Sequence, residues 1–262
     1  MNYLTDLSVE LGGAVFKNPV MPASGTYDYF ENNADCFPVS ELGAVMIKSV
    51  HRLQRPGNPG PRIAEVCGGM LNCVGIPSVG IEAFLRDELP RYENIGTQVI
   101  LSISGSEPVH YAEIAELVGD DPRIAALEMN LSCPNVGSGL PFSSDPQLLY
   151  DTVRQTRQRT TLPLYAKLSP NVTDIRVSCR AAEDAGADAL TLSNTFRAMT
   201  IDIQKRRPYL GNLSGGMSGP GMFPLAVRMV YQVYEAVSIP IVGMGGVTTA
   251  EDVICLLYTS PS

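Results

Sequence analysis

The sequence lacks the residue patterns that metal-binding and membrane-spanning proteins need. It has two histidines, and none of its six cysteines forms a Cys-x-x-Cys pair, so no zinc or iron–sulfur spacing is present. No apolar stretch approaches the roughly 20 residues that cross a bilayer. We therefore expect a protein with no metal of its own and no membrane segment.

Basic residues are also few and dispersed. The formal net charge is −8, and the 19 lysines and arginines are scattered apart from Lys205–Arg207. This argues against a nucleic-acid surface, and an anionic ligand would need local cations. Residues 1–6 have neither the basic nor the apolar region of a signal peptide, so a cytoplasmic location is expected.

The hydrophobic pattern predicts one large α/β domain. At 262 residues and 45% hydrophobic, the chain can bury a full core. Gly12-Gly13 between residues 6–11 and 14–17 predicts an opening β-hairpin. After it, seven predicted strands cover residues 20–23, 44–47, 98–103, 126–129, 164–168, 189–192 and 239–243. Predicted helices lie near residues 109–118, 146–159, 174–185 and 224–237.

Strands that alternate with helices indicate a parallel sheet. Seven units without a domain-sized linker fit a (β/α)₈ barrel better than a doubly wound sheet, and no Gly-x-Gly-x-x-Gly follows the first strand. In such barrels the chemistry lies on the loops after the carboxyl ends of the strands.

Polar residues and glycines follow each predicted strand. Lys48 and Lys167 lie within or just after apolar strands, where a charge that cannot reach water needs a partner, although each could also extend to the surface. The residues at the strand ends are Ala23-Ser24-Gly25-Thr26, Lys48-Ser49, Ser102–Gly105, Asn130–Asn135, Lys167, Ser193-Asn194-Thr195 and Gly243–Gly246.

The segment Asn130-Leu131-Ser132-Cys133-Pro134-Asn135 carries the most chemistry. Pro134 cannot donate to a sheet ladder, so strand pairing should stop near Cys133 and turn the two amides toward the same mouth as the thiol. Such a set suits a planar, polar substrate, while the alternative is a buried cysteine beside a turn.

Two glycine-rich segments precede predicted helices. They are Leu213–Gly221 and Gly245-Gly246, which suit phosphate binding through backbone N–H groups or serve as plain turns.

Taken together, these motifs closely resemble dihydroorotate dehydrogenase. The resemblance rests on Asn-x-x-Cys-Pro-Asn at 130–135, Lys48-Ser49, Gly69–Ile76, Lys167, Ser193-Asn194-Thr195 and Ser214–Pro220. It is most like the NAD-linked class 1B catalytic subunit, because Asn194-Thr195 is followed by Met199–Ile203. The resemblance implies an FMN-containing barrel that oxidises dihydroorotate to orotate in de novo pyrimidine synthesis.

The resemblance also implies roles for individual residues. Cys133 would take the C5 proton while hydride leaves C6 for the flavin, and Lys167 would lie near the N1–C2 edge of the flavin ring. Whether the Cys133 thiolate is favoured locally or neighbouring hydroxyls assist is left open. The implied substrate residues are Lys48, Asn72, Val74, Gly75, Ile76, Asn130, Asn194 and Thr195. The implied FMN residues are Ala23, Ser24, Gly25, Lys48, Ser49, Ser102, Asn130, Lys167, Ser193, Gly219, Gly245 and Gly246.

The family resemblance further implies a partner. Electrons would pass to NAD through an electron-transfer subunit carrying FAD and an iron–sulfur cluster, with the chain as a homodimer inside a heterotetramer. The alternatives are a fumarate-linked dihydroorotate dehydrogenase, a dihydropyrimidine dehydrogenase-like barrel, and an inactive barrel that binds flavin or phosphate.

Three positions depart from the family pattern. Ser102 stands where many relatives have asparagine, and Pro77-Ser78-Val79-Gly80 replaces Asn-Pro-Gly. After residue 254 the expected helix and eighth strand are missing, so we expect an incomplete FMN-binding barrel domain at 1–254 and a non-native tail at 255–262. The resulting sheet should have seven parallel strands and an open seam between residues 20–23 and 241–243.

Overall fold

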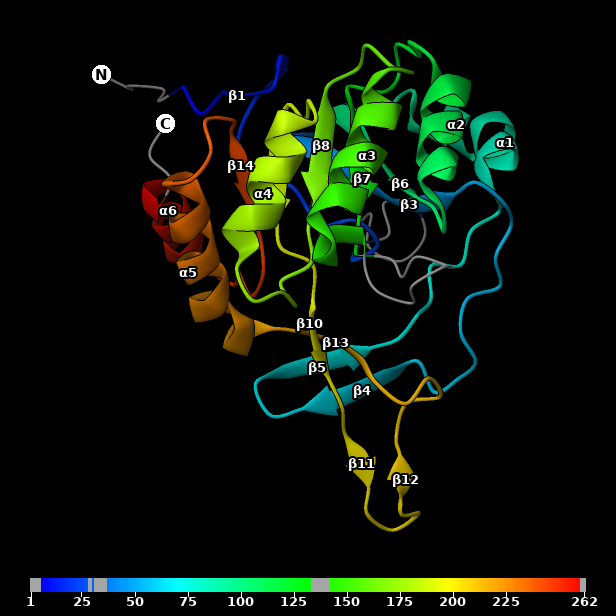
Figure 1. Ribbon diagram of the computed structural model, residues 1–262, viewed down its shortest axis with the longest axis vertical. Helices are drawn as coiled ribbons and strands as arrows, with labels where there is room; N and C mark the ends of the chain where they lie inside the picture. Colours follow the sequence, from blue (N-terminus) through cyan, green and yellow to red (C-terminus); the bar gives the residue numbers. More distant parts are fainter. Residues whose placement is uncertain (1–5, 28–29, 31–36, 133–141, 260–262) are drawn as a thin grey trace.

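The centre of the protein is a parallel β-sheet. The computed structural model describes residues 6–27, 30, 37–132 and 142–259 (Figure 1). Six parallel strands pair in the order β14-β9-β8-β7-β6-β3. Their bounds are β3 Ala44–His51, β6 Gln98–Ser104, β7 Ala126–Asn130, β8 Leu164–Lys167, β9 Ala189–Leu192 and β14 Ile241–Gly243.

Helices between and after these strands cover the outer side of the sheet (Figure 1). They are α2 Pro108–Val118, α3 Pro146–Arg157, α4 Ile175–Asp184, α5 Phe223–Tyr234 and α6 Ala250–Thr259. The carboxylate of Asp174 caps α4 by accepting the Arg176 N–H at 3.0 Å. The main hydrophobic core lies between these helices and the strands.

A second, smaller core closes the amino-terminal end of the strands. The hairpin of β1 (Val9–Leu11) and β2 (Ala14–Phe16) packs there, with Phe16 fully buried. The Tyr165 hydroxyl, from the inner side of β8, donates to the Leu11 carbonyl at 2.8 Å. This end of the barrel is therefore filled by side chains, and in such barrels a ligand is expected at the opposite end.

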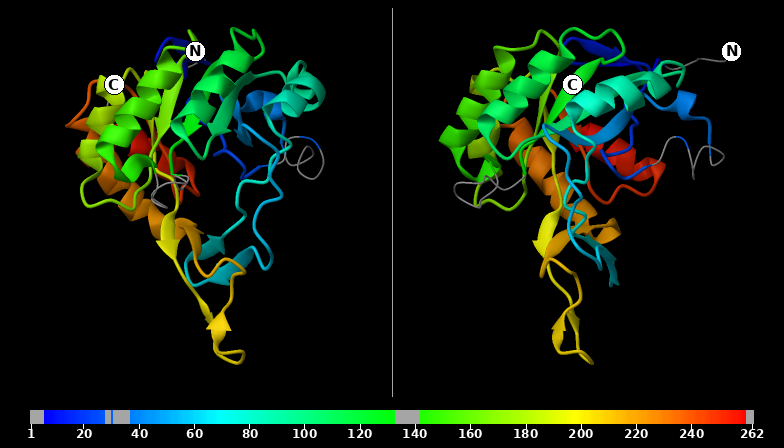
Figure 2. Two further views of the ribbon diagram at one scale, coloured as in Figure 1. Left: turned by 45° about the vertical axis from the view of Figure 1, so that its right-hand side comes forward. Right: turned by 90° about the vertical axis from the view of Figure 1, so that its right-hand side faces the viewer.

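A four-stranded antiparallel sheet lies beyond the carboxyl ends of the parallel strands (Figure 1). Its order is β10-β13-β5-β4, with β10 Phe196–Ala198, β13 Gly215–Ser218, β5 Gly69–Asn72 and β4 Ile63–Val66. Figure 2 shows the yellow hairpin of β11 (Ile201–Asp202) and β12 (Arg207–Pro208) projecting farthest from the body. The helical turns α1 Ile81–Ala83, η2 Phe84–Glu88 and η3 Leu89–Tyr92 lead from this region to β6.

The glycine-rich segment 213–221, predicted as a loop, is largely a strand. Gly216 pairs with Asn72 of β5 in an antiparallel register. A Cβ on Gly215 would lie 2.3 Å from the Asn72 carbonyl oxygen, so the absence of a side chain permits this close approach. The glycines thus serve strand packing here, and Gly219 follows directly after the strand.

The predicted strand–helix alternation is confirmed, with one exception. Residues 20–23 were predicted as the first parallel strand, and this prediction is wrong. Pro19 and Pro22 have no N–H to donate, and the segment joins the sheet by the Gly43 N–H bond to the Val20 carbonyl at 2.9 Å. The described residues therefore form six parallel strands rather than seven, and β3 and β14 end the sheet.

The domain boundary expected at residue 254 falls inside α6. This helix runs on to Thr259, and Leu256 is buried against the core. The division into 1–254 and 255–262 stays a prediction. None of the helices in the described part of the chain combines the length and apolar character that a membrane crossing needs.

His51, the last residue of β3, is a buried titratable group. Its Nδ1 accepts the Leu53 N–H at 3.3 Å, so in the neutral ring Nε2 carries the proton and donates to Ser106 Oγ at 3.2 Å. Burial lowers the pKa of His51 to about 4, and the charges of Arg55 and His110 add to the shift. The folded protein thus binds a second proton on the His51 ring less well than the unfolded chain does.

We expect His51 to make the fold acid-sensitive. Because its folded pKa is depressed, its contribution to stability is present above pH 6.5 and is lost as pH falls toward about 4. The loss should reach about 1–3 kcal/mol after allowance for solvent screening. Urea unfolding of the parent and of His51→Gln between these pH values checks this, and equal pH slopes in the two proteins would contradict it.

Candidate active site

The inner side of the barrel changes from apolar to polar along its strands. Near the amino ends the inward residues are apolar or aromatic: Ala44, Ile100, Ala126, Tyr165 and Ala189. Because side chains alternate along a strand, the residues two positions later also point inward. They include Ser102, Glu128, Lys167 and Thr191, all at most 4% exposed. A layer of buried polar side chains therefore lies at the carboxyl end of the strands, and we call this layer the chamber.

A β-bulge in β3 brings two further polar residues to this chamber. Ile47 pairs with Leu101 of β6, but the next pair is Val50 with Ile103, so β3 contains one extra residue. Lys48 and Ser49 occupy this bulge. The bulge lets consecutive residues of β3, rather than alternate ones, take part in the site.

Ser49 and Lys48 differ in environment. The Ser49 hydroxyl is buried and lies 2.8 Å from the Ser102 hydroxyl. Lys48 keeps contact with solvent, yet the surrounding protein desolvates its ammonium group enough to lower its pKa, and the charge of Arg62 lowers it further. A cation next to the mouth is thus available to an anionic ligand.

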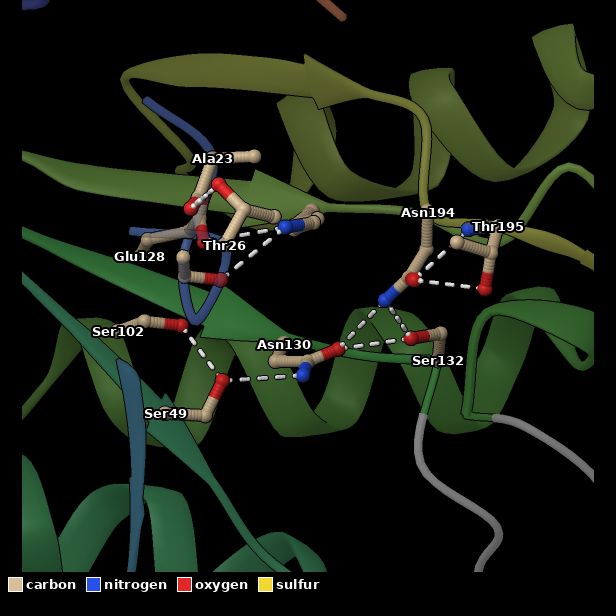
Figure 3. A network of polar contacts seen from close by, with 11 residues as sticks. Ala23, Thr26, Ser49, Ser102, Glu128, Asn130, Ser132, Asn194 and Thr195 are labelled. Carbon is tan, nitrogen blue, oxygen red and sulfur yellow. Dashed lines mark hydrogen bonds and ion pairs between the residues drawn. The ribbon is translucent and has the colours of Figure 1, made fainter. Parts of the chain in front are cut away.

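Asn130 joins the strand ends into one hydrogen-bond network (Figure 3). Its Nδ2 donates to Ser49 Oγ at 3.1 Å, and its Oδ1 accepts from Ser132 Oγ at 2.7 Å and from Asn194 Nδ2 at 3.1 Å. Asn194 Nδ2 also donates to Ser132 Oγ, and the Tyr111 hydroxyl donates to the Asn130 carbonyl at 2.8 Å. These bonds fix which way the Asn130 amide faces.

The small sheet brings Asn72 to the same region. Asn194 Oδ1 accepts the Thr195 N–H at 2.8 Å. A Cβ on Gly216 would lie 1.9 Å from Thr195 Oγ1, and the Gly216 carbonyl accepts from Asn72 Nδ2 at 3.3 Å. The structure thus brings together Asn72, Asn194 and Thr195, three residues predicted to bind substrate.

The loop after β5 holds the remaining predicted substrate residues. Asn58 fixes this loop, because its N–H donates to the Val74 carbonyl at 3.0 Å and its Nδ2 to the Cys73 carbonyl at 2.9 Å. Gly75 has φ +79°, and a Cβ there would meet Asn58 atoms at 2.5 Å. Ile76 follows with φ 50°. The residues Pro77–Gly80 depart from the family pattern, and a β-bridge between Ser78 and Arg55 sets their path.

Lys167 and the turn at residues 23–26 form the other wall of the chamber. The Lys167 Nζ donates to Ser24 Oγ at 3.2 Å and lies 3.7 Å from Glu128 Oε1. A Cβ on Gly25 would lie 3.4 Å from Lys48 Cγ, so the turn runs between the two lysines. The turn itself is closed by bonds from Thr26 to the Ala23 carbonyl.

Three of the predicted cofactor glycines meet the start of α5. A Cβ on Gly246, at φ +74°, would lie 2.6 Å from Phe223 N and 2.7 Å from the Gly219 carbonyl oxygen. A Cβ on Gly245 would lie 3.3 Å from Ala226 Cβ. Ser193 is separate from this group: it is buried after β9, and its hydroxyl donates to the Asn194 carbonyl at 3.0 Å.

Some residues of the chamber were not expected from the sequence. Glu128 and Thr191 are each 1% exposed, and within the described residues Glu128 Oε1 and Thr191 Oγ1 accept or donate no hydrogen bond. An acidic residue inside the apolar run 124–129 was the available signal for Glu128. Ser132 lies inside the motif at residues 130–135, but the sequence assigned it no role.

Cys133, the predicted base, lies outside the described residues. Its neighbour Ser132 is in contact with both Asn130 and Asn194. Within 6–27, 30, 37–132 and 142–259, no three His, Cys, Asp or Glu side chains gather as a metal ion would require.

Comparison with known proteins decides the family. Residues 6–259 match the family model described as dihydroorotate dehydrogenase. The chain belongs to the dihydroorotate dehydrogenase family. Its (β/α) barrel character, predicted from the alternation of elements, agrees with the sheet order described above.

Members of the dihydroorotate dehydrogenase family named "Dihydroorotate dehydrogenase B (NAD(+)), catalytic subunit" are close relatives. The protein of Geobacillus kaustophilus is 47% identical over 257 residues, which cover 98% of this chain and 82% of the relative. The protein of Desulforudis audaxviator is 49% identical over 248 residues, covering 94% and 81%. The protein of Geotalea uraniireducens is 47% identical over 250 residues, covering 95% and 82%. The subgroup that the motifs indicated is therefore the one whose name these relatives carry.

The Asn130 network gives a stability prediction. Ser49→Ala removes the acceptor of the Asn130 amide and the partner of the Ser102 hydroxyl, both in buried surroundings. We expect a loss of about 1–3 kcal/mol in the free energy of unfolding, measured with urea. Ser40→Ala, at an exposed serine, is the control and should change little. Equal stability of the two variants would contradict the network.

Proposed function

We propose that this chain is the FMN-dependent catalytic subunit that oxidises dihydroorotate to orotate in pyrimidine synthesis. The observation that carries the proposal is the amide cluster around Asn130, fixed at the polar end of a barrel whose other end is filled. The family match and the names of the relatives support the same reaction.

The chemistry of the chamber suits the substrate. Orotate is a planar anion with imide and carboxylate edges, and imide groups are read by side chains that both donate and accept. Asn72, Asn130 and Asn194 supply such amides, and Thr195 adds a hydroxyl. Lys48 supplies a positive charge beside them. We assign the loop of Val74, Gly75 and Ile76 to the same ligand, because Asn58 holds it in one path.

The residues present also fit FMN, and when bound it would accept the hydride that leaves C6 of dihydroorotate. Lys167 has three N–H groups, of which Ser24 takes one. Gly246 packs closely against Phe223 N at the start of α5, and backbone N–H groups at a helix start suit a phosphate group. We assign Ala23, Ser24, Gly25, Ser49, Ser102, Lys167, Ser193, Gly219, Gly245 and Gly246 to this cofactor.

We assign the removal of the C5 proton to Cys133. A free thiol titrates near ~8.5, so at neutral pH the base needs help from its surroundings. Ser132 is the nearest described hydroxyl in the sequence, and its contacts with Asn130 and Asn194 orient it. This arrangement supports assistance by a hydroxyl as one of the two routes that the sequence leaves open.

The relatives are named as catalytic subunits, which implies an assembly with another subunit. We propose that the partner carries FAD and an iron–sulfur cluster and passes electrons to NAD, and that two copies of this chain form the centre of a heterotetramer. A cytoplasmic location and the domain division at residue 254 remain predictions from the sequence.

The test of the function is anaerobic reduction of the bound flavin by dihydroorotate. Loss of the visible flavin absorbance would support cofactor, substrate and half-reaction together. Bleaching by dihydrouracil instead would favour the dihydropyrimidine dehydrogenase-like alternative. A flavin that neither compound reduces would favour the inactive barrel, and reoxidation by fumarate without a partner subunit would favour the fumarate-linked form.

Cys133→Ala tests the proposed base. The variant should bind FMN as the parent does, but dihydroorotate should reduce its flavin about 10²–10⁴-fold more slowly, because the C5 proton has no positioned acceptor. Stopped-flow absorbance measures the rate. Cys255→Ala, at an exposed thiol on α6, is the control. If the rate of flavin reduction in Cys133→Ala is within about threefold of the parent rate, the assignment of Cys133 as the base is wrong.

Gly246→Ala tests the proposed phosphate contact. The added Cβ would clash with Phe223 N, and the left-handed backbone adds strain. We expect the FMN dissociation constant to rise at least about tenfold in a flavin fluorescence titration. Gly13→Ala, with φ +92° and no atom within 4 Å of the added Cβ, carries the backbone strain alone. Equal FMN affinity in both variants would contradict the contact.

A further inference from the structure

Glu128 is a buried acidic side chain to which the proposed reaction gives no role. It is 1% exposed and points into the barrel from β7, one inward position before Asn130. Burying a carboxylate is costly unless a partner compensates it. A carboxylate buried at this depth therefore needs a compensating group nearby.

Lys167 is its nearest cation. The Lys167 Nζ lies 3.7 Å from Glu128 Oε1, and the two side chains are 5% and 1% exposed. Figure 3 shows Glu128 beside the turn that carries Ala23 and Thr26. In this low-dielectric surrounding the attraction between the two charges is little screened by solvent.

The geometry leaves part of each group available. Ser24 accepts one Lys167 N–H, and Glu128 Oε1 takes part in the ion pair without a hydrogen bond from any described residue. The ammonium therefore lies between the Ser24 hydroxyl and the Glu128 carboxylate. It keeps at least one N–H for a ligand.

We propose that Glu128 is a positioning residue, which fixes the place of the Lys167 ammonium within the chamber and offsets its charge. The inference rests on the proposed function, because it takes FMN as the ligand that Lys167 faces. With the carboxylate in place, the ion pair is neutral overall, and the site favours the more negative, reduced flavin less than a lone lysine would. Glu128 thereby lowers the reduction potential of the bound cofactor.

Glu128→Gln and Glu128→Asp separate charge from shape. The glutamine keeps the size and removes the charge, whereas the aspartate keeps the charge on a shorter side chain. For Glu128→Gln we expect the affinity for reduced FMN, relative to oxidised FMN, to rise about tenfold, which is about 30 mV for a two-electron couple. Glu128→Asp should shift the potential by less than half of this.

The measurement is a spectroelectrochemical titration of the flavin in the purified holoprotein. Glu113→Gln is the matched control, because it removes a carboxylate that pairs with Arg52 at 2.8 Å on the outer side. It should leave the potential unchanged. Equal potentials in the parent and Glu128→Gln, or equal shifts in Glu128→Gln and Glu128→Asp, would overturn the proposal.

A second measurement does not depend on the flavin. If Glu128 and Lys167 pair, replacing Glu128 by glutamine should lower the melting temperature of the apoprotein much less in a Lys167→Gln background than in the parent. Additive effects would count against the pair even if Glu128→Gln alone folds poorly.

The outcomes also separate this inference from the proposed function. A parent protein that binds no FMN, or whose flavin dihydroorotate does not bleach, would defeat the proposed function. A parent that bleaches normally, with a potential insensitive to Glu128→Gln, would defeat only the role of Glu128.

Discussion

The site depends on the orientation of one side-chain amide, that of Asn130. Its nitrogen donates to a hydroxyl from β3, and its oxygen accepts from groups that follow β7 and β9. Because an amide has distinct donor and acceptor ends, these three partners allow one orientation only. Strand ends that are far apart in the chain are thereby held in a fixed relation. The bond to Ser49 is buried, so its loss would leave a polar atom without compensation.

The bulge in β3 explains how a regular strand can serve this network. In an unbroken strand only one of Lys48 and Ser49 would point inward. The extra residue between the pairs at Ile47 and Val50 gives the buried wall a hydroxyl and the open mouth a cation. The barrel therefore combines a neutral hydrogen-bonded wall around Asn130 with Lys48 near the mouth and a buried Lys167–Glu128 pair, an arrangement suited to a ligand that is planar and partly anionic.

Much of this could be predicted from the sequence because apolar runs and strand-end residues are local signals. The alternation predicted the parallel sheet, and Lys167, Asn130 and Asn194 were expected at the strand ends where the structure has them. Lys48 was expected just after a strand at 44–47, but β3 continues to His51 and Lys48 lies in its bulge. The strand at residues 20–23 was wrong because hydropathy does not count the N–H groups that prolines lack. Glu128 was passed over inside an apolar run, since its partner Lys167 lies 39 residues later and only the fold makes them neighbours. The small sheet was missed because glycines in a strand have the same local pattern as glycines in a loop.

That small sheet has a consequence for the order of folding. The bond from Asn72 to the Gly216 carbonyl joins residues 144 positions apart, and four of the parallel strands lie between them in the sequence. Closing so long a loop in an unfolded chain carries a large entropy cost, which falls once β6, β7, β8 and β9 have paired and shortened the path. The barrel should consequently form first and the sheet over its mouth last. During synthesis β13 is made after β6 to β9, so a nascent chain would hold much of the filled floor and polar wall before β5 gains β13 as its partner strand.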